Sequence, residues 1–550
     1  MRRTHSAFVA IIATLCALAL GACQPRAAHE DDTLPHFVEQ NGRHAFIVDG
    51  EPFLILGAQA NNSSNYPAAL EEVWPAIADM HANTLEIPVA WEQIEPTEGS
   101  FDFSYVDTLV AQARTHNVRL ILLWFATWKN TSPSYAPAWV KENNERFPRM
   151  INREGRVHYA LSPHFQATLD ADRRAFAALM RHLREIDGRQ QTVIMVQIEN
   201  EPGAYGSPRD YSPTAQALFD GPVPTALVQA LHDEPGTWRE VFGDEADVSF
   251  YAWHVAHYID QVAAAGQAEY ALPMYANAAL RDPFNAQDPA TYASGGPTFN
   301  VINIWKVAAP SLAVLAPDVY ARDHRTATAH FAHYARPDNP LMIVEIGNDA
   351  DYARYFFHVL GNNGVGFAPF GMDYTGYGNY PLGAAVVNAE TVAPFASLYE
   401  VLAPMARDWA KLSLEHPTWG VAKPDDGADQ TLELGRWRAT VDYDEWQFGQ
   451  SSWAFLGQQE RRPESLLQQG GAMIVELAPD DYLLIAQNTR VSFALADPAT
   501  ANGMLFSSVE EGRFQNGEWV ADRRWNGDQT DYGLNFGMRP RVLRVRLASY

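Results

Sequence analysis

The stretch Thr192-Val-Ile-Met-Val-Gln-Ile-Glu-Asn-Glu201 begins with apolar and β-branched residues and ends in two carboxylates and an amide. A second stretch, Leu341-Met-Ile-Val-Glu345, has the same form: an apolar run that ends in a glutamate. Apolar runs of this length indicate strands that are buried on both faces, as in parallel sheets. In a barrel of parallel strands, the reactive groups lie at the C-terminal ends of the strands. We therefore expect Glu201 and Glu345 at the same end of one barrel.

Six further strand-like runs alternate with helix-like stretches. The eight expected strands are Phe53–Gly57, Thr84–Val89, Val118–Trp124, Val193–Ile198, Leu272–Ala276, Val314–Pro317, Met342–Glu345 and Val365–Pro369. Amphipathic segments between them include Tyr105–His116, Phe165–Ile186 and Thr237–Ala265. This alternation predicts an α/β fold, a (β/α)8 TIM barrel, over residues 35–405. A doubly wound open sheet is the alternative, but no glycine-rich phosphate loop follows the first strand.

The pattern changes after residue 405. A chain of 550 residues is too long for one compact core, so a second, smaller domain is expected. Short alternating runs predict that residues 406–550 form a linker and an antiparallel β-sandwich. The runs are Trp437–Asp442, Ala472–Leu477, Tyr482–Ala486, Val491–Ala494 and Arg541–Leu547.

The N-terminus has the features of a targeting segment. Arg2 and Arg3 precede the apolar run Ala7–Leu20, which is too short to span a bilayer and is typical of a signal peptide. The run is followed by Gly21-Ala22-Cys23, and the whole resembles the lipobox of bacterial lipoproteins, in which the cysteine carries lipid. An ordinary signal peptide that is cut after Ala22 is the alternative.

The lipobox resemblance implies a signal peptide over residues 1–22, lipidation of Cys23 and a flexible tether over residues 23–34. Gln24 follows the cysteine, and by the same resemblance this favours the outer membrane of a Gram-negative cell. The expected location is therefore the cell envelope, with membrane contact through the N-terminal anchor only.

The composition excludes several classes of function. Hydrophobic residues make up 47% of the chain and charged residues 19%, which indicates a folded globular protein. A net charge of −26 opposes nucleic acid, whose phosphates it repels, and leaves a neutral substrate unopposed. The two cysteines are Cys16 and Cys23, so the mature chain has no internal disulfide. No histidine group has a known ligand spacing, so neither a metal nor another cofactor is expected.

The two strand-end glutamates have the chemistry of a carboxylate pair. Because side chains alternate along a strand, Gln197 and Glu199 are expected to point into the barrel, beneath Glu201. Burial and a neighbouring carboxylate separate the pKa values of such a pair, so that one stays protonated and the other ionised. Two facing carboxylates of this kind can cleave a glycosidic bond, and a gap near ~5 Å makes the reaction retaining. A helix-capping or salt-bridged Glu201 is the alternative.

Several motifs resemble glycoside hydrolase family 35, the β-galactosidases. Gln197-Ile-Glu-Asn-Glu201 is similar to that family's Gln-x-Glu-Asn-Glu-Tyr-Gly signature. Its opening strand resembles residues 51–57, and its second strand and the Gly-x-Phe-Asp-Phe that follows resemble residues 83–96 and 98–103. The resemblance covers about residues 45–375. It implies that Glu201 is the acid/base, that Glu345 is the nucleophile and that Asn200 bonds the sugar hydroxyl next to the anomeric carbon.

The chain also departs from this family. Pro202-Gly-Ala stands between the acid/base and Tyr205-Gly206, as though three residues were inserted. Thr127 stands where the family keeps a galactose-binding glutamate, and Asn130 is expected to replace that group. These departures, with the C-terminal sandwich, resemble a bacterial subgroup that includes β-galactosidases acting on xyloglucan side chains.

Aromatic residues at expected loop positions complete the candidate site. A ring that faces the apolar side of a sugar provides binding energy without strict geometry. The candidates are Trp128, Trp305, Tyr320 and Tyr374. Core packing is the alternative for each of them.

The resemblance implies a lipid-anchored, retaining exo-β-galactosidase that acts on plant-derived oligosaccharides such as those of xyloglucan. Two alternatives stay open at this point. One is an endo-acting retaining β-glycanase of the same clan, which needs an open groove. The other is a non-catalytic glycan-binding surface lipoprotein.

Overall fold

The computed structural model describes residues 34–443, 452–453, 457–458 and 463–550. The predicted signal peptide, Cys23 and all of the predicted tether except Leu34 lie outside the described residues. Among the helices of the described part, none has the length and apolar character needed to cross a membrane.

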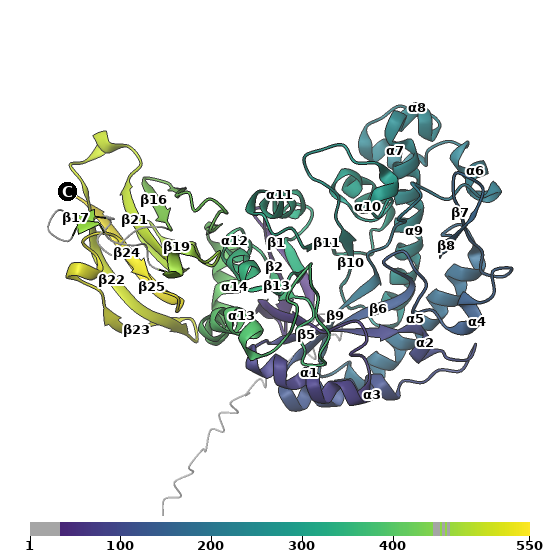
Figure 1. Ribbon diagram of the computed structural model, residues 1–550, viewed down its shortest axis with the longest axis horizontal. Helices are drawn as coiled ribbons and strands as arrows, with labels where there is room; N and C mark the ends of the chain where they lie inside the picture. Colours follow the sequence, from purple (N-terminus) through teal and green to yellow (C-terminus); the bar gives the residue numbers. More distant parts are fainter. Residues whose placement is uncertain (1–33, 444–451, 454–456, 459–462) are drawn as a thin grey trace, which may run out of the picture.

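Eight parallel strands form a closed barrel (Figure 1). In chain order they are β4 (Ile55–Gln59), β5 (Thr84–Ala90), β6 (Arg119–Lys129), β9 (Val193–Asn200), β10 (Met274–Ala279), β11 (Val314–Val319), β12 (Met342–Ile346) and β13 (Gly366–Pro369). All eight predicted strands are confirmed, with ends that differ by a few residues. The fold class predicted from the sequence is therefore confirmed.

Helices surround the barrel. The longer ones are α1 (Pro67–Asp79), α3 (Ser104–His116), α5 (Gln166–Asp187), α9 (Ala246–Glu269), α11 (His324–Tyr334) and α13 (Ala389–Leu402). The shorter ones are α2 (Trp91–Ile94), α4 (Ala138–Lys141), α6 (Pro213–Phe219), α7 (Thr225–Leu231), α8 (Trp238–Phe242), α10 (Ile302–Ala308) and α12 (Tyr355–Gly361). The single helix predicted over Thr237–Ala265 is wrong. Gly243 has a φ of 54°, which ends α8, and a 3-10 turn separates it from α9.

The N-terminal end of the barrel is closed by a small antiparallel sheet of β1 (His36–Gln40), β2 (Arg43–Val48) and β3 (Glu51–Phe53). Phe46 and Val48 of this sheet join one apolar cluster with inward residues of the barrel strands, such as Ile55 and Val344. The lower half of the barrel is thus a packed core. Polar side chains can therefore accumulate only at the other end of the barrel, the C-terminal end of the strands.

A short hairpin of β7 (Arg149–Ile151) and β8 (Val157–Leu161) belongs to the connection between β6 and α5.

The C-terminal domain is a sandwich of two antiparallel sheets, as predicted. One sheet has the order β14 (Thr418–Ala422), β19 (Gly471–Ala478), β20 (Asp481–Gln487), β25 (Arg541–Ser549), β22 (Met504–Gln515), β23 (Glu518–Arg524). The other has the order β15 (Gln430–Leu434), β16 (Trp437–Asp442), β21 (Thr489–Leu495), β24 (Leu534–Phe536), and a separate pair is β17 (Ser452–Trp453) with β18 (Gly457–Gln458). Residues of both sheets, including Trp437 and Leu484, share one core.

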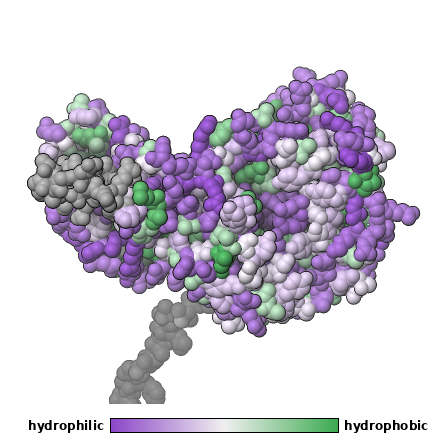
Figure 2. Space-filling view, in the orientation of Figure 1, coloured by the Kyte–Doolittle hydropathy of each residue, from purple (hydrophilic) through white to green (hydrophobic). Residues whose placement is uncertain are grey.

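The sandwich and the barrel have a continuous apolar interface. Met473 and Ile485, on the outer face of the six-stranded sheet, belong to the same cluster as Phe356 and Phe357 of α12. Helix α14 (Ala406–Glu415), which follows the domain boundary expected at residue 405, contacts β2 and β3 of the small sheet that closes the barrel. The face shown in Figure 2 is mostly hydrophilic, with small scattered hydrophobic groups.

Candidate active site

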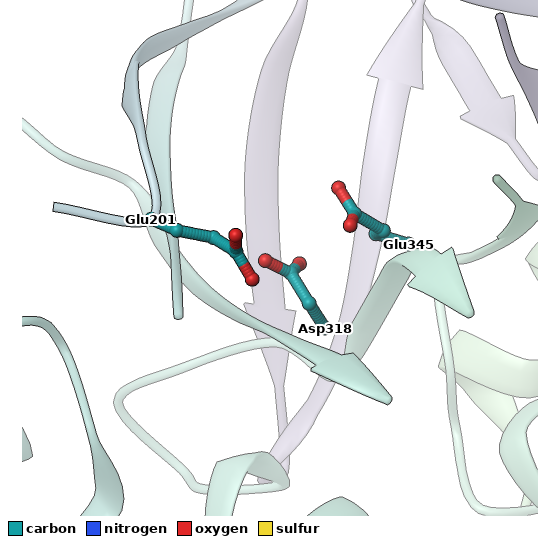
Figure 3. Close-up of side chains that lie close together, drawn as sticks. All are labelled: Glu201, Asp318 and Glu345. Carbon is teal, nitrogen blue, oxygen red and sulfur yellow. The ribbon is translucent and has the colours of Figure 1, made fainter. Parts of the chain in front are cut away.

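Three carboxylates meet at the C-terminal end of the barrel (Figure 3). Glu201 follows β9, Asp318 belongs to β11 and Glu345 to β12, and one oxygen of each lies within 4.8 Å of the others. Asp318 and Glu345 are register partners on neighbouring strands. The structure therefore brings together the two glutamates that the strand ends predicted and adds Asp318, which the sequence analysis missed. Its only signal in the sequence was its place directly after the sixth predicted strand.

The position of Glu201 is fixed by its backbone conformation and by a hydrogen bond from its N–H group. Its φ of 44° lies in the left-handed region, and its N–H donates to Asn277 Oδ1 at 2.8 Å. The residue is 8% exposed. Burial and then the charge of Glu345 raise the pKa of Glu201 to about 7, although the nearby Lys129 lowers it. Glu201 can therefore carry a proton near neutral pH and release it, as an acid/base group must.

Glu345 has a hydrogen-bond donor on each oxygen. Gln59 Nε2 donates to Oε2 at 3.1 Å, and the Tyr320 hydroxyl donates to Oε1 at 2.6 Å. Burial and the charge of Glu345 raise the pKa of Tyr320 well above its usual value, so this hydroxyl keeps its proton and stays a donor. The two donors fix the orientation of the Glu345 carboxylate toward Glu201. Tyr320 is thus in the site, although as a partner of a carboxylate rather than as a stacking ring.

Asp318 links to Glu201 directly and through Asn277. Its Oδ2 accepts from Asn277 Nδ2 at 2.7 Å, and its carboxyl forms a hydrogen bond with that of Glu201. Burial first, and then the charges of Glu345 and Glu201, raise the pKa of Asp318 well above its usual value. Burial and these charges therefore favour the protonated form of Asp318.

The direction predicted for Glu199 is wrong. Its φ of 60° breaks the alternation of the strand, and its side chain turns out of the barrel toward the helix layer. There its Oε2 accepts from the Trp128 N–H at 2.6 Å, and its carboxyl bonds that of Asp172 on α5. Gln197 is buried as expected and donates to the Glu199 carbonyl at 2.9 Å.

A pocket of about 770 Å³ opens above the three carboxylates. Asn130 and Tyr320, both predicted to bind the substrate, line it. Among the lining residues that the sequence analysis did not select are Lys129, Tyr205 and Arg281. Asn200, also predicted to bind the substrate, immediately precedes Glu201 and is fully buried rather than part of the pocket lining, and neither of its amide atoms has a partner within the described part of the chain. Buried amides are rarely left unpaired, so Asn200 is free to bond a ligand.

Three predicted sugar-binding rings do not reach this pocket. Trp128 and Trp305 are fully buried, and their indole N–H groups donate to the carbonyls of Leu161 and Gly295. The Tyr374 hydroxyl donates to Asp79 on α1 at 2.7 Å. These predictions are wrong because the sequence places a residue near the loop end of the barrel without giving its side-chain direction.

Thr127 is a core residue. Its hydroxyl lies 2.6 Å from Asp172 Oδ2 and 2.8 Å from the Tyr258 hydroxyl, and the side chain is fully buried. A glutamate at this position would therefore meet Asp172 if the backbone kept its course. Asn130, three residues later, lines the pocket, as does Lys129 at the end of β6.

Among the described residues, Glu201, Asp318 and Glu345 are the acidic or histidine side chains that lie close enough together to hold a metal ion. Hard cations require six or more oxygen ligands. Here Asn277, Gln59 and Tyr320 direct hydrogen-bond donors at these carboxylates. The arrangement suits proton transfer and nucleophilic attack better than it suits cation binding.

Two family models match the chain. A glycoside hydrolase family 42 model, described as Beta-galactosidase, matches residues 67–242, which include Glu201. A model described as a domain of unknown function matches residues 395–537, which include most of the sandwich.

Similar proteins include a Beta-galactosidase of Xanthomonas manihotis, 26% identical over 206 residues, which cover 37% of this chain and 32% of that protein. Beta-galactosidase 14 of Arabidopsis thaliana is 23% identical over 198 residues, covering 34% of this chain and 20% of that protein. An Endo-1,4-beta-xylanase of Naganishia albida is 34% identical over 105 residues, which cover 19% of this chain and 28% of that protein. The chain thus spans at most 32% of the length of these relatives.

Solved structures that match the chain include a β-galactosidase from the psychrophilic Marinomonas ef1, with a TM-score of 0.46, 15% identity and coverage of 66% of this chain and 62% of that one. The catalytic domain of a β-amylase from Paenibacillus polymyxa has a TM-score of 0.44 and 12% identity, and the match covers 57% of this chain and 91% of that one. The sequence matches support a glycoside hydrolase of the β-galactosidase type. They do not single out family 35.

Proposed function

We propose that this protein is a retaining β-galactosidase that removes terminal β-galactosyl residues by double displacement. The observation that carries the proposal is the separation of Glu201 and Glu345, whose nearest oxygens lie within 4.8 Å at the base of a pocket. Retaining glycosidases have carboxyl groups about 5 Å apart, whereas inverting enzymes need about 6.5–9.5 Å to admit a water. The match to a β-galactosidase model over residues 67–242 supports the sugar.

In the first step, protonated Glu201 donates its proton to the glycosidic oxygen as the bond to the anomeric carbon breaks. Glu345 attacks that carbon and forms a galactosyl ester, and the rest of the substrate leaves as an alcohol. In the second step, ionised Glu201 takes a proton from water, whose oxygen attacks the anomeric carbon. Galactose leaves with retained configuration, Glu345 is released as a carboxylate and Glu201 is protonated again.

The natural substrate that we propose is a galactosylated plant oligosaccharide, such as one from xyloglucan, attacked at its free end. A pocket of about 770 Å³ lies within the ~300–1,000 Å³ that small-ligand sites occupy, and it is large enough for sugar units beyond the one that is cleaved. Asn200, Asn130 and Lys129 supply polar groups for hydroxyls. The family 35 resemblance around Gln197–Glu201 supports this narrower assignment.

A panel of nitrophenyl glycosides tests the sugar. Release from the β-galactoside alone is expected, and release from another glycoside alone would contradict the assignment. The roles of the two glutamates are tested with azide and a substrate that has an activated leaving group. Glu345→Gly should give the α-galactosyl azide, because azide then attacks once with inversion. Glu201→Ala should give the β-galactosyl azide, because azide attacks the ester. Full activity of either variant without azide would overturn its role.

One observation favours a second candidate, an endo-acting β-glycanase of the same clan. It is the 34% identity to an endo-1,4-beta-xylanase over 105 residues. Such an enzyme would shorten a polysaccharide without releasing monosaccharide, which gel-permeation analysis of the products detects.

We also propose that Cys23 carries a lipid that attaches the protein to the cell envelope, at the outer membrane. The lipobox-like Leu20-Gly-Ala-Cys23 supports this proposal. Labelled palmitate should be incorporated into the natural chain and not into Cys23→Ser. Equal incorporation into both would contradict it.

A further inference from the structure

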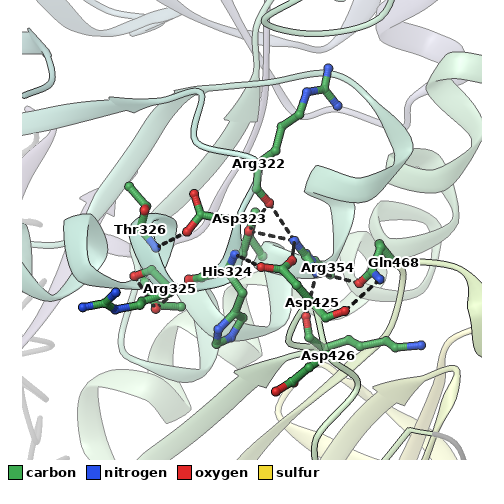
Figure 4. A network of polar contacts seen from close by, with 12 residues as sticks. Arg322, Asp323, His324, Arg325, Thr326, Arg354, Asp425, Asp426 and Gln468 are labelled. Atoms are coloured by element: carbon green, nitrogen blue, oxygen red, sulfur yellow. Dashed lines mark hydrogen bonds and ion pairs between the residues drawn. The ribbon is translucent and has the colours of Figure 1, made fainter. Parts of the chain in front are cut away.

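The loop between β11 and α11 extends from the active site to the C-terminal domain. At one end, the Tyr320 hydroxyl donates to Glu345 at 2.6 Å. At the other end, the Arg322 carbonyl accepts from Arg354, and the His324 N–H donates to Asp425, which follows β14 of the sandwich (Figure 4). Three residues thus separate Tyr320, which holds the proposed nucleophile, from His324, whose N–H is held by the other domain.

Arg354 joins this loop to the C-terminal domain. It is 2% exposed, and its Nη2 donates to the Arg322 carbonyl at 2.7 Å and to Asp425 Oδ1 at 2.8 Å. Its Nη1 donates to the Lys423 carbonyl at 2.9 Å and to Gln468 Oε1 at 3.0 Å. A guanidinium has a rigid, planar set of donors, so these four bonds fix the loop and two segments of the C-terminal domain relative to one another.

Asp425 is the C-terminal domain's contribution to this junction. One carboxylate oxygen pairs with Arg354, and the other accepts from the His324 N–H at 2.8 Å, at the first residue of α11. The Asp425 carboxylate therefore binds both Arg354, whose side chain bonds the loop, and the backbone of His324, where the loop ends. Its side chain is 47% exposed, so it can be replaced without opening the core.

The segment that carries Arg354 also holds the loop from the active-site side. The Tyr352 hydroxyl donates to the Tyr320 carbonyl at 2.7 Å, and the Tyr355 hydroxyl donates to the Arg322 carbonyl at 2.9 Å. This segment continues into α12, which contacts β14 and β19 of the sandwich. The position of Tyr320 over Glu345 therefore depends on contacts that include the C-terminal domain.

We propose that the C-terminal domain is a positioning part of the active site: Asp425 fixes Arg354, Arg354 fixes the loop of residues 320–323, and the loop holds Tyr320 against Glu345. This role deepens the proposed glycosidase function and rests on it. The positioning role gives a function to the region of the chain that is matched by a domain model of unknown function. Tyr320 touches a reacting group, whereas Arg354 and Asp425 are positioning residues.

Asp425→Ala in the full chain tests the proposal against a matched control. The kcat on nitrophenyl β-galactoside should fall about 10- to 100-fold with little change in KM, because a displaced Tyr320 misplaces the nucleophile rather than the binding groups. The control is Asn362→Ala. It removes another bond between barrel and sandwich, Asn362 Nδ2 to the Gly420 carbonyl at 3.0 Å, which does not reach the loop. Its kcat should stay unchanged. Equal kcat in both variants would overturn the proposal.

A double-mutant cycle shows whether the effect passes through Tyr320. If it does, Asp425→Ala combined with Tyr320→Phe should be no slower than Tyr320→Phe alone. Independent, multiplicative losses would show that Asp425 acts by another route and would overturn the proposal. Arg354→Lys is a second test in the same cycle, and it should give a loss at least as large as that of Asp425→Ala, because a lysine cannot replace the planar set of guanidinium donors.

A crystal structure of Asp425→Ala separates this inference from the proposed function. The Tyr320 hydroxyl is expected to lie beyond hydrogen-bond distance of Glu345, and an unchanged Tyr320–Glu345 bond would overturn the positioning role. If the natural chain hydrolyses no glycoside of the panel, the proposed function fails, and the crystal structure still decides the positioning role.

Discussion

At the scale of single residues, the site depends on how burial, charges and hydrogen-bond donors set the pKa values of close carboxylates. Burial and the charges of Glu345 and Glu201 raise the pKa of Asp318 well above its usual value. Glu201 is left with a pKa of about 7, which suits a group that must donate a proton in one step and accept one in the next. Lys129 is the cation that holds this pKa down.

Lys129→Met should therefore move the pH dependence of the reaction. Loss of the positive charge raises the pKa of Glu201, and Glu201 must be protonated to start the reaction. The basic limb of the kcat/KM profile should shift to higher pH, as measured over the neutral to alkaline range. Lys141→Met is the control, because Lys141 pairs with Glu92 at 2.8 Å and should leave the limb in place. A shift to lower pH would contradict the assignment of this limb to Glu201.

Sequence reasoning found the two glutamates because each ends an apolar strand, and strand ends converge in a barrel. It missed Asp318, since an aspartate after a strand is common and its contact with Glu201 exists only in three dimensions. It misplaced Trp128 and Trp305 for a related reason. Both residues lie near the loop end of the barrel, but their rings turn into the core.

At the scale of elements, the barrel strands were predictable because parallel strands are buried on both faces and appear as continuous apolar runs. The pair β22 and β23 escaped prediction because most residues of β22 are half-buried or exposed, β23 is largely exposed, and both carry many charged residues, among them Glu510, Arg513, Arg523 and Arg524. The break between α8 and α9 was missed because the apolar pattern continues across it, and a single glycine, Gly243, ends the first helix.

Strand β6 and helix α5 are joined by a polar contact that tests the place of Thr127. Thr127→Val keeps the shape of the side chain but removes the hydroxyl that bonds Asp172 and Tyr258. The free energy of unfolding should fall by about 1–3 kcal/mol, because Asp172 loses a buried partner, while KM for the galactoside stays unchanged. Urea unfolding and steady-state kinetics measure the two quantities.

Thr108→Val is the control for this change. It also removes a threonine hydroxyl bond, from Thr108 to the Ser104 carbonyl, but on the exposed side of α3. Its stability should change by less than that of Thr127→Val. A raised KM with unchanged stability in Thr127→Val would instead place position 127 in the sugar site.

At the scale of the whole molecule, the two domains behave as one packed body. The six-stranded sheet uses one face for the core of the sandwich and the other for the barrel, so its strands β19 and β20 are apolar on both sides. Their sequences are continuous apolar runs for that reason. This arrangement lets the C-terminal domain act on a loop of the active site, because neither domain can move without exposing apolar surface.

The two domains approach each other closely at two glycines, and this contact predicts the cost of separating the domains. A Cβ on Gly361, at the end of α12, would lie 2.3 Å from the Gly420 Cα and 2.5 Å from the Trp419 carbonyl oxygen of β14. Both contacts are with backbone, which cannot turn aside as a flexible side chain can. Gly361→Ala should therefore lower the free energy of unfolding by about 1–3 kcal/mol, as measured by calorimetry.

Gly537→Ala in the sandwich is the matched control, because its Cβ would meet nothing within 4 Å. It should leave the stability unchanged. If Gly361→Ala is as stable as Gly537→Ala, then α12 and β14 can move apart without cost, and the rigid contact between the domains is refuted. Gly361→Ala could instead be destabilised and also have a lower kcat. This result would show that a displaced α12 also displaces Tyr352 and Arg354, and with them the active-site loop that these two residues hold.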